Sequence, residues 1–256
     1  MTRLMVVTFG LYAALAGCSG EARKLEIASE NSAGNCIVAT DALVTLQEIA
    51  GEYYFGDGLG LNCSLTLTKQ GDFVIKSSGC VSHLEYGGRA NLKGGVLSLT
   101  PNESNVPEQG RDVETEFFPV SWGTRMYLIP TKRNIEFCND VNAGFEPRHM
   151  PYGCYFLRDD DWKSTVAGLP TVHEPWNKYL LSKPVSGKIT ELIERQEAWV
   201  DLGTDHGILQ GMMLHAQVRH PWMSPDVTVE AVEKNRCRIK HEKYHVLEVG
   251  QGFSSR

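Results

Sequence analysis

The sequence lacks the motifs that identify most enzymes and nucleic-acid-binding proteins. None of its seven cysteines forms a C-x-x-C pair, so the sequence lacks the cysteine spacing that is typical of zinc ribbons and thioredoxins. No G-x-S-x-G, G-x-G-x-x-G or complete G-K-[ST] motif occurs. Lysine and arginine number 25 against 31 acidic residues, a net charge of −6. We therefore expect neither a nucleic-acid-binding face nor a polybasic membrane footprint, since both need clustered positive charge.

Long apolar runs are also missing. The run from Leu4 to Leu15, which follows Arg3, is shorter than the roughly 18–20 residues that a membrane-spanning helix needs. It ends in Leu15-Ala16-Gly17-Cys18, and this arrangement resembles the signal peptide and lipobox of bacterial lipoproteins. The resemblance implies cleavage before Cys18, acylation of Cys18, and its position as the mature N-terminus. A cleaved secretory peptide with a chance cysteine is the alternative.

The resemblance also implies a location. Residues 1–17 are then the signal peptide, and their removal takes away Arg3 and changes the net charge to −7. Ser19, rather than aspartate, follows the acylated cysteine, which fits the outer-membrane sorting pattern of the family. We expect a lipid anchor in the outer membrane with the protein facing the periplasm.

The six remaining cysteines are expected to form disulfides, because export places them in an oxidising compartment. A hairpin that turns at residues 69–72 would bring Cys63 near Cys80, so this pair is the first choice. Cys138 with Cys154 is the second, on sequence proximity alone. We expect no metal ion and no cofactor.

The pattern of the chain predicts a mostly β protein with two domains. Residues 18–50 are expected to be a lipidated tether with a short helix over residues 40–49, capped by Thr40 or Asp41. Residues 51–157 alternate apolar and polar side chains in short stretches, which predicts an antiparallel sandwich or barrel. Within them, residues 134–142 are the one expected helix.

Residues 158–184 are expected to be a linker and residues 185–256 a small β-barrel. Glycines at 203, 207 and 211 allow tight corners between short strands. The C-terminal segment resembles small β-barrel modules of bacterial envelope proteins, such as that of flagellar assembly protein T. The opening Gly51-Glu52-Tyr53 of the first domain is faintly lipocalin-like.

A zinc-protease motif, H-E-x-x-H, occurs at His241, Glu242 and His245. The motif works on a helix, where both imidazoles lie on one face and the glutamate activates water. The flanking residues 237–240 and 246–249 have the pattern of strands, on which residues four apart are roughly 13 Å apart. A zinc hydrolase is therefore the least favoured hypothesis.

Other candidates for a site are few. Asp159-Asp160-Asp161 lacks the spacing of a calcium loop and is expected to be a solvated turn. The five tryptophans are expected to be core or domain-interface residues, and Trp222, between Pro221 and Met223, is the best candidate for an exposed contact.

Two functional hypotheses follow, neither of them catalytic. The first is an envelope lipoprotein that binds or scaffolds another envelope component through sheet edges and loops. The second is a lipocalin-like carrier of a small apolar ligand, if the first domain encloses a cavity.

Overall fold

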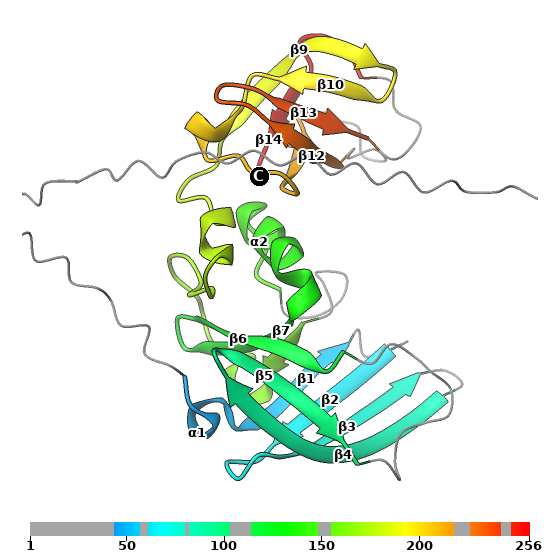
Figure 1. Cartoon of the computed structure of the whole chain (residues 1–256), viewed down its shortest axis with the longest axis vertical. Helices are drawn as coiled ribbons and strands as arrows, with labels where there is room; N and C mark the ends of the chain where they lie inside the picture. The colour runs from blue at the N-terminus through cyan, green and yellow to red at the C-terminus, as the bar shows by residue number, and fades with distance from the viewer. Residues whose placement is uncertain are drawn as a thin grey trace, which may run out of the picture. The chain divides into compact units, whose positions relative to one another are not determined.

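The structure is a computed structural model that describes residues 44–56, 61–79, 82–102, 114–147, 155–217, 226–241 and 247–256. These residues belong to one compact unit, Ala42–Arg256. They form two closed antiparallel β-barrels (Figure 1), which confirms the predicted mostly β fold and shows that the first domain is a barrel. None of the helices in the described part of the chain has the length and apolar character that crossing a bilayer demands.

The first barrel is an up-and-down arrangement in which each strand pairs with the next and the last strand pairs with the first. Alternate side chains of the strands point inward, and those in the interior are almost all apolar and buried. Its strands are β1 (Gly51–Gly56), β2 (Leu61–Leu67), β3 (Asp72–Gly79), β4 (Ser82–Lys93), β5 (Val96–Pro101), β6 (Glu116–Trp122), β7 (Arg125–Pro130) and β8 (Phe156–Arg158).

The long, curved strand β4 changes partner along its length (Figure 1). Its first part pairs with β3 as far as Arg89, and its last part pairs with β5 from Gly88 onward. A Cβ atom at Gly88 would overlap the carbonyl oxygen of Thr100, so only glycine allows the two backbones to approach at this point. The first part of β4 therefore extends the sheet beside β3, and its last part extends the sheet beside β5.

A one-turn helix, α1 (Leu46–Ile49), packs into the core of the first barrel before β1 begins. Thr45 and Glu48 form a capping box, so the helix begins at Leu46; the predicted caps Thr40 and Asp41 lie outside the described residues. Ile49 is fully buried, and this burial contributes about 2 kcal/mol to the free energy of folding. The Tyr53 hydroxyl donates to the Ile49 carbonyl at 2.6 Å and joins the helix to β1.

The helix α2 (Asn134–Asn142) lies between β7 and β8, and its presence and bounds confirm the prediction. Phe137, Cys138 and Val141 are buried in a second apolar cluster against β6 and β7, and Ile135 is half-buried. Short 3₁₀ helices occupy the connections: η2 (Thr131–Arg133), η3 (Asp159–Asp161), η4 (Trp176–Tyr179) and η5 (Thr204–His206).

The aspartate run at 159–161 differs from the predicted solvated turn. Asp161 is only 7% exposed and accepts the Met126 backbone N–H at 2.8 Å. Arg158 binds both carboxylate oxygens of Asp161 and also donates to the Glu48 carbonyl at 3.2 Å. Asp161 therefore holds η3 against β7 and β8, a structural role that the run of three acids did not indicate.

The second barrel has six strands in the order β10-β13-β12-β11-β14-β9. The predicted corners are present: Gly207 and Gly211 have φ of +79° and +88°, and a Cβ atom at Gly203 would lie 2.5 Å from the Glu233 carbonyl oxygen. Its strands are β9 (Ser186–Glu194), β10 (Glu197–Val200), β11 (Met213–Ala216), β12 (Asp226–Val232), β13 (Cys237–Lys240) and β14 (Gly252–Ser254).

Candidate functional site

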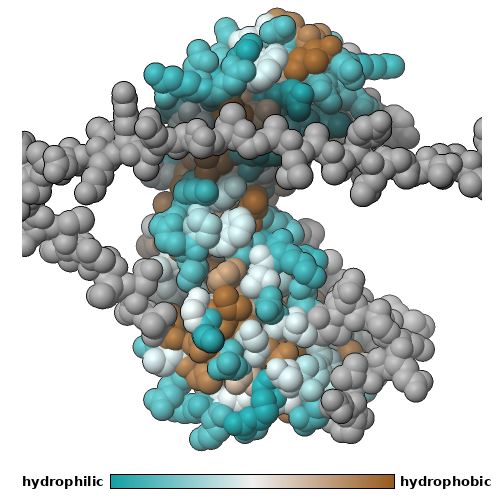
Figure 2. Space-filling model, viewed as in Figure 1, coloured by the Kyte–Doolittle hydropathy of each residue, from teal (hydrophilic) through white to brown (hydrophobic). Residues whose placement is uncertain are grey.

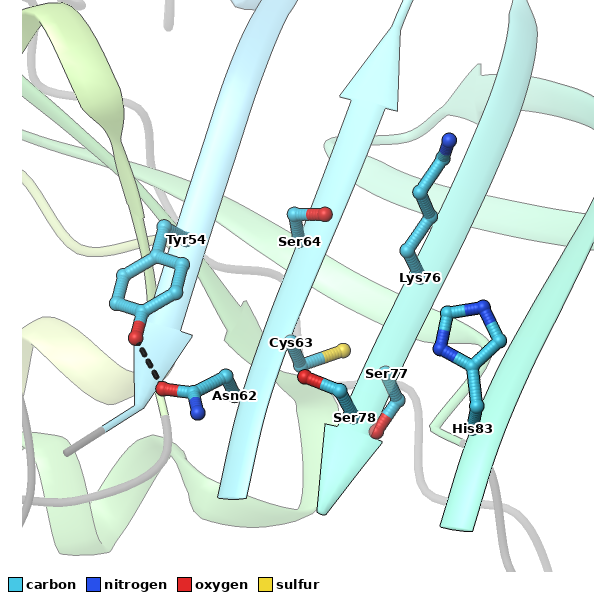
Figure 3. A pocket seen from close by; sticks show the side chains of 8 residues that line it. All are labelled: Tyr54, Asn62, Cys63, Ser64, Lys76, Ser77, Ser78 and His83. Atoms are coloured by element: carbon cyan, nitrogen blue, oxygen red, sulfur yellow. Dashed lines mark hydrogen bonds between the residues drawn. The ribbon is translucent and has the colours of Figure 1, made fainter. Parts of the chain in front are cut away.

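A polar hollow of about 250 Å³ lies on the first barrel where β1 to β4 run side by side (Figure 3). It is lined by Tyr54, Asn62, Cys63, Ser64, Lys76, Ser77, Ser78 and His83. Six of these residues alternate along their strands with inward-facing neighbours, so they belong to the outer face of the barrel. Cys63 and Ser77 belong to the inward-facing row between them.

The strand register arranges the outer residues in two cross-strand rows. One row contains Tyr54, Ser64, Lys76 and Glu85, in the order of the strands β1, β2, β3 and β4. Directly paired residues have Cβ atoms about 5 Å apart, so each side chain in a row contacts or nearly contacts the next.

The second row contains Gly56, Asn62, Ser78 and His83. The hollow follows from the sizes of the side chains in the two rows. The small residues Gly56 and Ser78 alternate with larger ones in this row, as Ser64 does in the first, and leave a depression among the bulkier side chains.

Polar interactions fix part of the lining. The Tyr54 hydroxyl donates to Oδ1 of Asn62, and Figure 3 shows the two side chains pointing toward one another. Lys76 Nζ lies 3.3 Å from Oε1 of Glu85, and about half of each side chain is exposed. Lys76 is thus a cation at the hollow whose partner is also in contact with water.

Behind this face, two side chains that are buried in the barrel interior carry polar groups: Cys63, which also lines the hollow, and Tyr86. Burial raises the pKa of the Cys63 thiol to about 11, and a hydrogen bond with Ser77 opposes this shift. Burial is the main cause that raises the pKa of Tyr86 to about 12, and the nearby Cys63 raises it further. The Tyr86 hydroxyl has no hydrogen-bond partner among the described residues. Both groups are therefore protonated at neutral pH, and the thiol is a poor nucleophile.

The structure describes one member of each predicted disulfide. Cys63 and Cys138 are both buried and have no disulfide partner among the described residues, whereas Cys80 and Cys154 lie outside them. Cys63 is opposite Ser77 in the β2–β3 hairpin, and the predicted turn at residues 69–72 is confirmed. No disulfide is seen among the described residues, and both pairings stay predictions.

The other predicted site residues are mostly outside the described part of the chain. This applies to the lipidation residue Cys18, to Trp222, and to Glu242 and His245 of the zinc motif. His241 is 5% exposed and directly follows β13, which forms at residues 237–240 as predicted. No group of three potential metal ligands occurs among the residues that the structure describes.

The flanks of that motif agree only in part with the prediction. Residues 237–240 form β13, but Leu247 and Glu248 follow the motif as irregular structure rather than as a strand. Leu247 is buried in the core of the second barrel. The backbone N–H of His241 donates to the Gln196 carbonyl at 3.0 Å, which extends the pairing of β13 toward the β9–β10 turn.

The prediction that sheet edges and loops bind a partner stays a prediction, and the pairing of the strands shows which edges are open. Both barrels are closed, so each described strand is hydrogen-bonded to a neighbour on both sides. Closure satisfies most of the backbone groups that strand addition requires, but among the described residues Ser82–Tyr86 of β4 pair only with β3 and have no strand on their other edge. Recognition by these barrels can therefore use their faces, their loops or this open edge of β4.

Sequence reasoning did not identify any outer residue of the hollow as a site. In the sequence, the outer residues are simply the polar positions of strands in which apolar and polar residues alternate: Asn62, Ser64, Lys76 and Ser78. Any half-exposed sheet has such positions. Their proximity depends on the register of four strands. No known protein family, curated protein or solved structure matches the chain.

Proposed function

We propose that the protein is a lipid-anchored lipoprotein of the bacterial cell envelope, attached to the outer membrane through Cys18 and facing the periplasm. It acts there as a non-catalytic binding or scaffolding protein for another envelope component. The lipobox Leu15-Ala16-Gly17-Cys18 supports the location. The polar hollow over β1 to β4 is the observation that supports binding.

The packing of the barrels favours recognition at the outer surface. Large side chains such as Tyr53, Leu65, Phe73 and Phe117 fill the interior of the first barrel and are at most 2% exposed. The second barrel has a similarly buried apolar interior. Its visible face is largely hydrophilic in Figure 2, which fits a body in contact with water.

The location is tested by labelling cells with a palmitate analogue. The full chain is expected to take up the label and fractionate with the outer membrane, and Cys18→Ser should abolish both. Labelling that persists in the Cys18→Ser variant contradicts the proposed anchor.

Binding at the hollow is tested in intact cells with a photo-crosslinking amino acid. Placed at His83, where the side chain that lines the hollow is already large and exposed, it should give a discrete crosslinked product. The exposed Thr100 on β5 is the matched control position and should give none. Equal crosslinking at both positions contradicts a binding role for the hollow.

A lipocalin-like carrier is the second candidate. An eight-stranded up-and-down barrel is the architecture that lipocalins use to hold one small ligand. The buried Tyr86 hydroxyl, which has no partner in the described part of the chain, is a polar group in the interior that a ligand would satisfy. Saturable one-to-one binding of an apolar dye by the fragment from Gly20, which contains the whole compact unit, would favour this function.

A further inference from the structure

We propose that the hollow over β1 to β4 binds a small phosphate ester, with the anionic oxygens next to Lys76 and the hydroxyl-bearing part against Ser64, Ser78 and Asn62. This inference rests on the binding function proposed above and names the class of ligand for it.

The charge of the lining points to an anion. The chain contains 31 acidic residues, yet none of the eight described residues that line the hollow is acidic. Lys76 supplies a cation, and the His83 ring supplies a further hydrogen-bonding nitrogen. An ammonium group forms charge-assisted hydrogen bonds with phosphate oxygens, which are stronger than bonds between neutral groups.

The existing partner of Lys76 does not prevent this. Its ion pair with Glu85 has an Nζ–Oε1 distance of 3.3 Å, and the two side chains are 55% and 50% exposed. Exposed pairs of this kind contribute little free energy, because water screens both charges. A phosphate group with up to two negative charges can therefore bind the Lys76 ammonium group, either beside the Glu85 carboxylate or in its place.

The neutral side chains suit the rest of such a ligand. Each serine hydroxyl can donate one hydrogen bond and accept others, as ligand hydroxyls also require. The bond from Tyr54 holds the Asn62 amide in one orientation. A volume of about 250 Å³ is below the range of about 300–1,000 Å³ that is typical of drug-sized ligands, so the hollow admits one small polar unit.

The lining is also held in place before a ligand arrives. Its residues lie on four neighbouring strands of a closed barrel, and cross-strand pairing fixes their spacing. Sites built on strands keep their geometry better than sites built on loops.

The test measures binding of inorganic phosphate, glucose 6-phosphate and glucose to the full chain in a neutral detergent, through the amide NMR shifts of Ser64 and Ser78. Both phosphates should shift these amides saturably, and glucose should bind more weakly than its phosphate ester. Lys76→Gln should weaken glucose 6-phosphate binding about tenfold, because a charge-assisted hydrogen bond is lost. The matched control Lys93→Gln, an exposed lysine at the far end of β4, should leave affinity unchanged.

Two further variants test the geometry. Glu85→Gln removes the competing carboxylate and should tighten binding about threefold. Ser78→Leu fills the hollow and should abolish binding, while the unchanged NMR spectrum elsewhere reports an intact fold. Equal binding by wild type and Lys76→Gln, or weaker binding by Glu85→Gln, overturns the proposal.

A parallel arm distinguishes the source of the phosphate. If vesicles of phosphatidic acid in phosphatidylcholine bind in a Lys76-dependent way and soluble esters bind more weakly, the phosphate belongs to a lipid headgroup. If none of the phosphates binds, the ligand class is wrong. A specific crosslink at His83 would in that case leave the broader binding function in place, so the two proposals fail separately.

Discussion

Tyr155, just before β8, donates its hydroxyl hydrogen to Oδ2 of Asp140 on α2 at 2.9 Å. Burial raises the pKa of this aspartate to about 6, the Tyr155 bond opposes the shift, nearby Glu136 adds to it, and His215 lowers it. The native state therefore holds a proton on Asp140 at a pH where an unfolded chain would have released it.

This pKa shift predicts that Asp140 makes the protein more stable as the pH falls from about 6 toward about 4, because the proton binds more tightly in the folded state. Asp140→Asn should raise the free energy of unfolding at pH 7.5 by about 2 kcal/mol, since each pKa unit corresponds to about 1.4 kcal/mol and partial solvent exposure reduces the total. The asparagine Oδ1 can still accept the Tyr155 hydroxyl. Urea unfolding at several pH values measures the effect.

The gain should shrink toward zero at pH 4, where the wild-type carboxyl is itself largely protonated. Asp160→Asn, on the exposed side of η3, serves as the control and should leave the stability unchanged. A gain from Asp140→Asn that is the same at pH 4 and pH 7.5 would contradict the linkage argument.

A second prediction concerns Arg158, which connects β8, η3 and the end of α1. Arg158→Lys should lower the free energy of unfolding by about 2 kcal/mol, because a single ammonium cannot bind both oxygens of Asp161 and also the Glu48 carbonyl. Asp161 is buried, so an incompletely paired charge remains in the fold. Thermal or urea unfolding is the measurement.

Arg89→Lys is the matched control for that substitution. Arg89 pairs with Asp72, but the two side chains are 66% and 55% exposed. The change should cost less than about 0.5 kcal/mol. Equal losses in the two variants would show that the Arg158 cluster contributes no more than a surface ion pair.

The strands of both barrels could largely be predicted, because apolar and polar residues alternate in short stretches that are separated by turn residues. Residues 61–67 and 96–100, for example, alternate clearly, and α2 was found because its apolar residues recur with helical spacing. The choice between sandwich and barrel could not be made. It depends on the pairing of β8 with β1, a contact between Tyr53 and Arg158 across most of the domain.

The hollow could not be predicted for a related physical reason. Ser64 and Lys76 become neighbours only through the register of β2 and β3, and His83 joins Ser78 only through that of β3 and β4. A single sequence gives the face of each residue but not its partner across the strands. The role of Asp161 was missed because burial depends on η3 packing against β1, not on the local acidic composition.

A third prediction concerns the thiols. Burial raises the pKa of Cys63 to about 11 and that of Cys138 and Cys237 to about 12, so the thiolate fraction at pH 8 is small. Native protein should therefore resist iodoacetamide at these three positions, as mass spectrometry of the peptides would show. Rapid labelling of native Cys63 would contradict its burial.

The same experiment tests the two predicted disulfides. In denaturant without a reductant, Cys237, which neither predicted pair includes, should be labelled. Cys63 and Cys138 should stay unlabelled if each is bonded to its predicted partner, and should become labelled after reduction. Labelling of all three without a reductant would show that neither pairing exists in the purified protein.

The last prediction concerns Asn139 on α2, which binds two backbone groups of one segment. Its Nδ2 donates to the Gly211 carbonyl at 3.1 Å, and its Oδ1 accepts the Met213 N–H at 3.0 Å. Asn139 is 7% exposed, so replacing it leaves two backbone groups with impaired access to water. Asn139→Ala should therefore cost about 2–3 kcal/mol of unfolding free energy.

Asn139→Asp separates the two bonds, because aspartate keeps the acceptor for Met213 but places a second oxygen opposite the Gly211 carbonyl. It should destabilise the protein more at pH 8 than at pH 4, where a protonated carboxyl can again donate a hydrogen bond. Hydrogen exchange of the Met213 amide should accelerate in Asn139→Ala, whereas the exposed control Asn91→Ala should leave that amide protected. Unchanged exchange in Asn139→Ala would show that this side chain does not hold the segment.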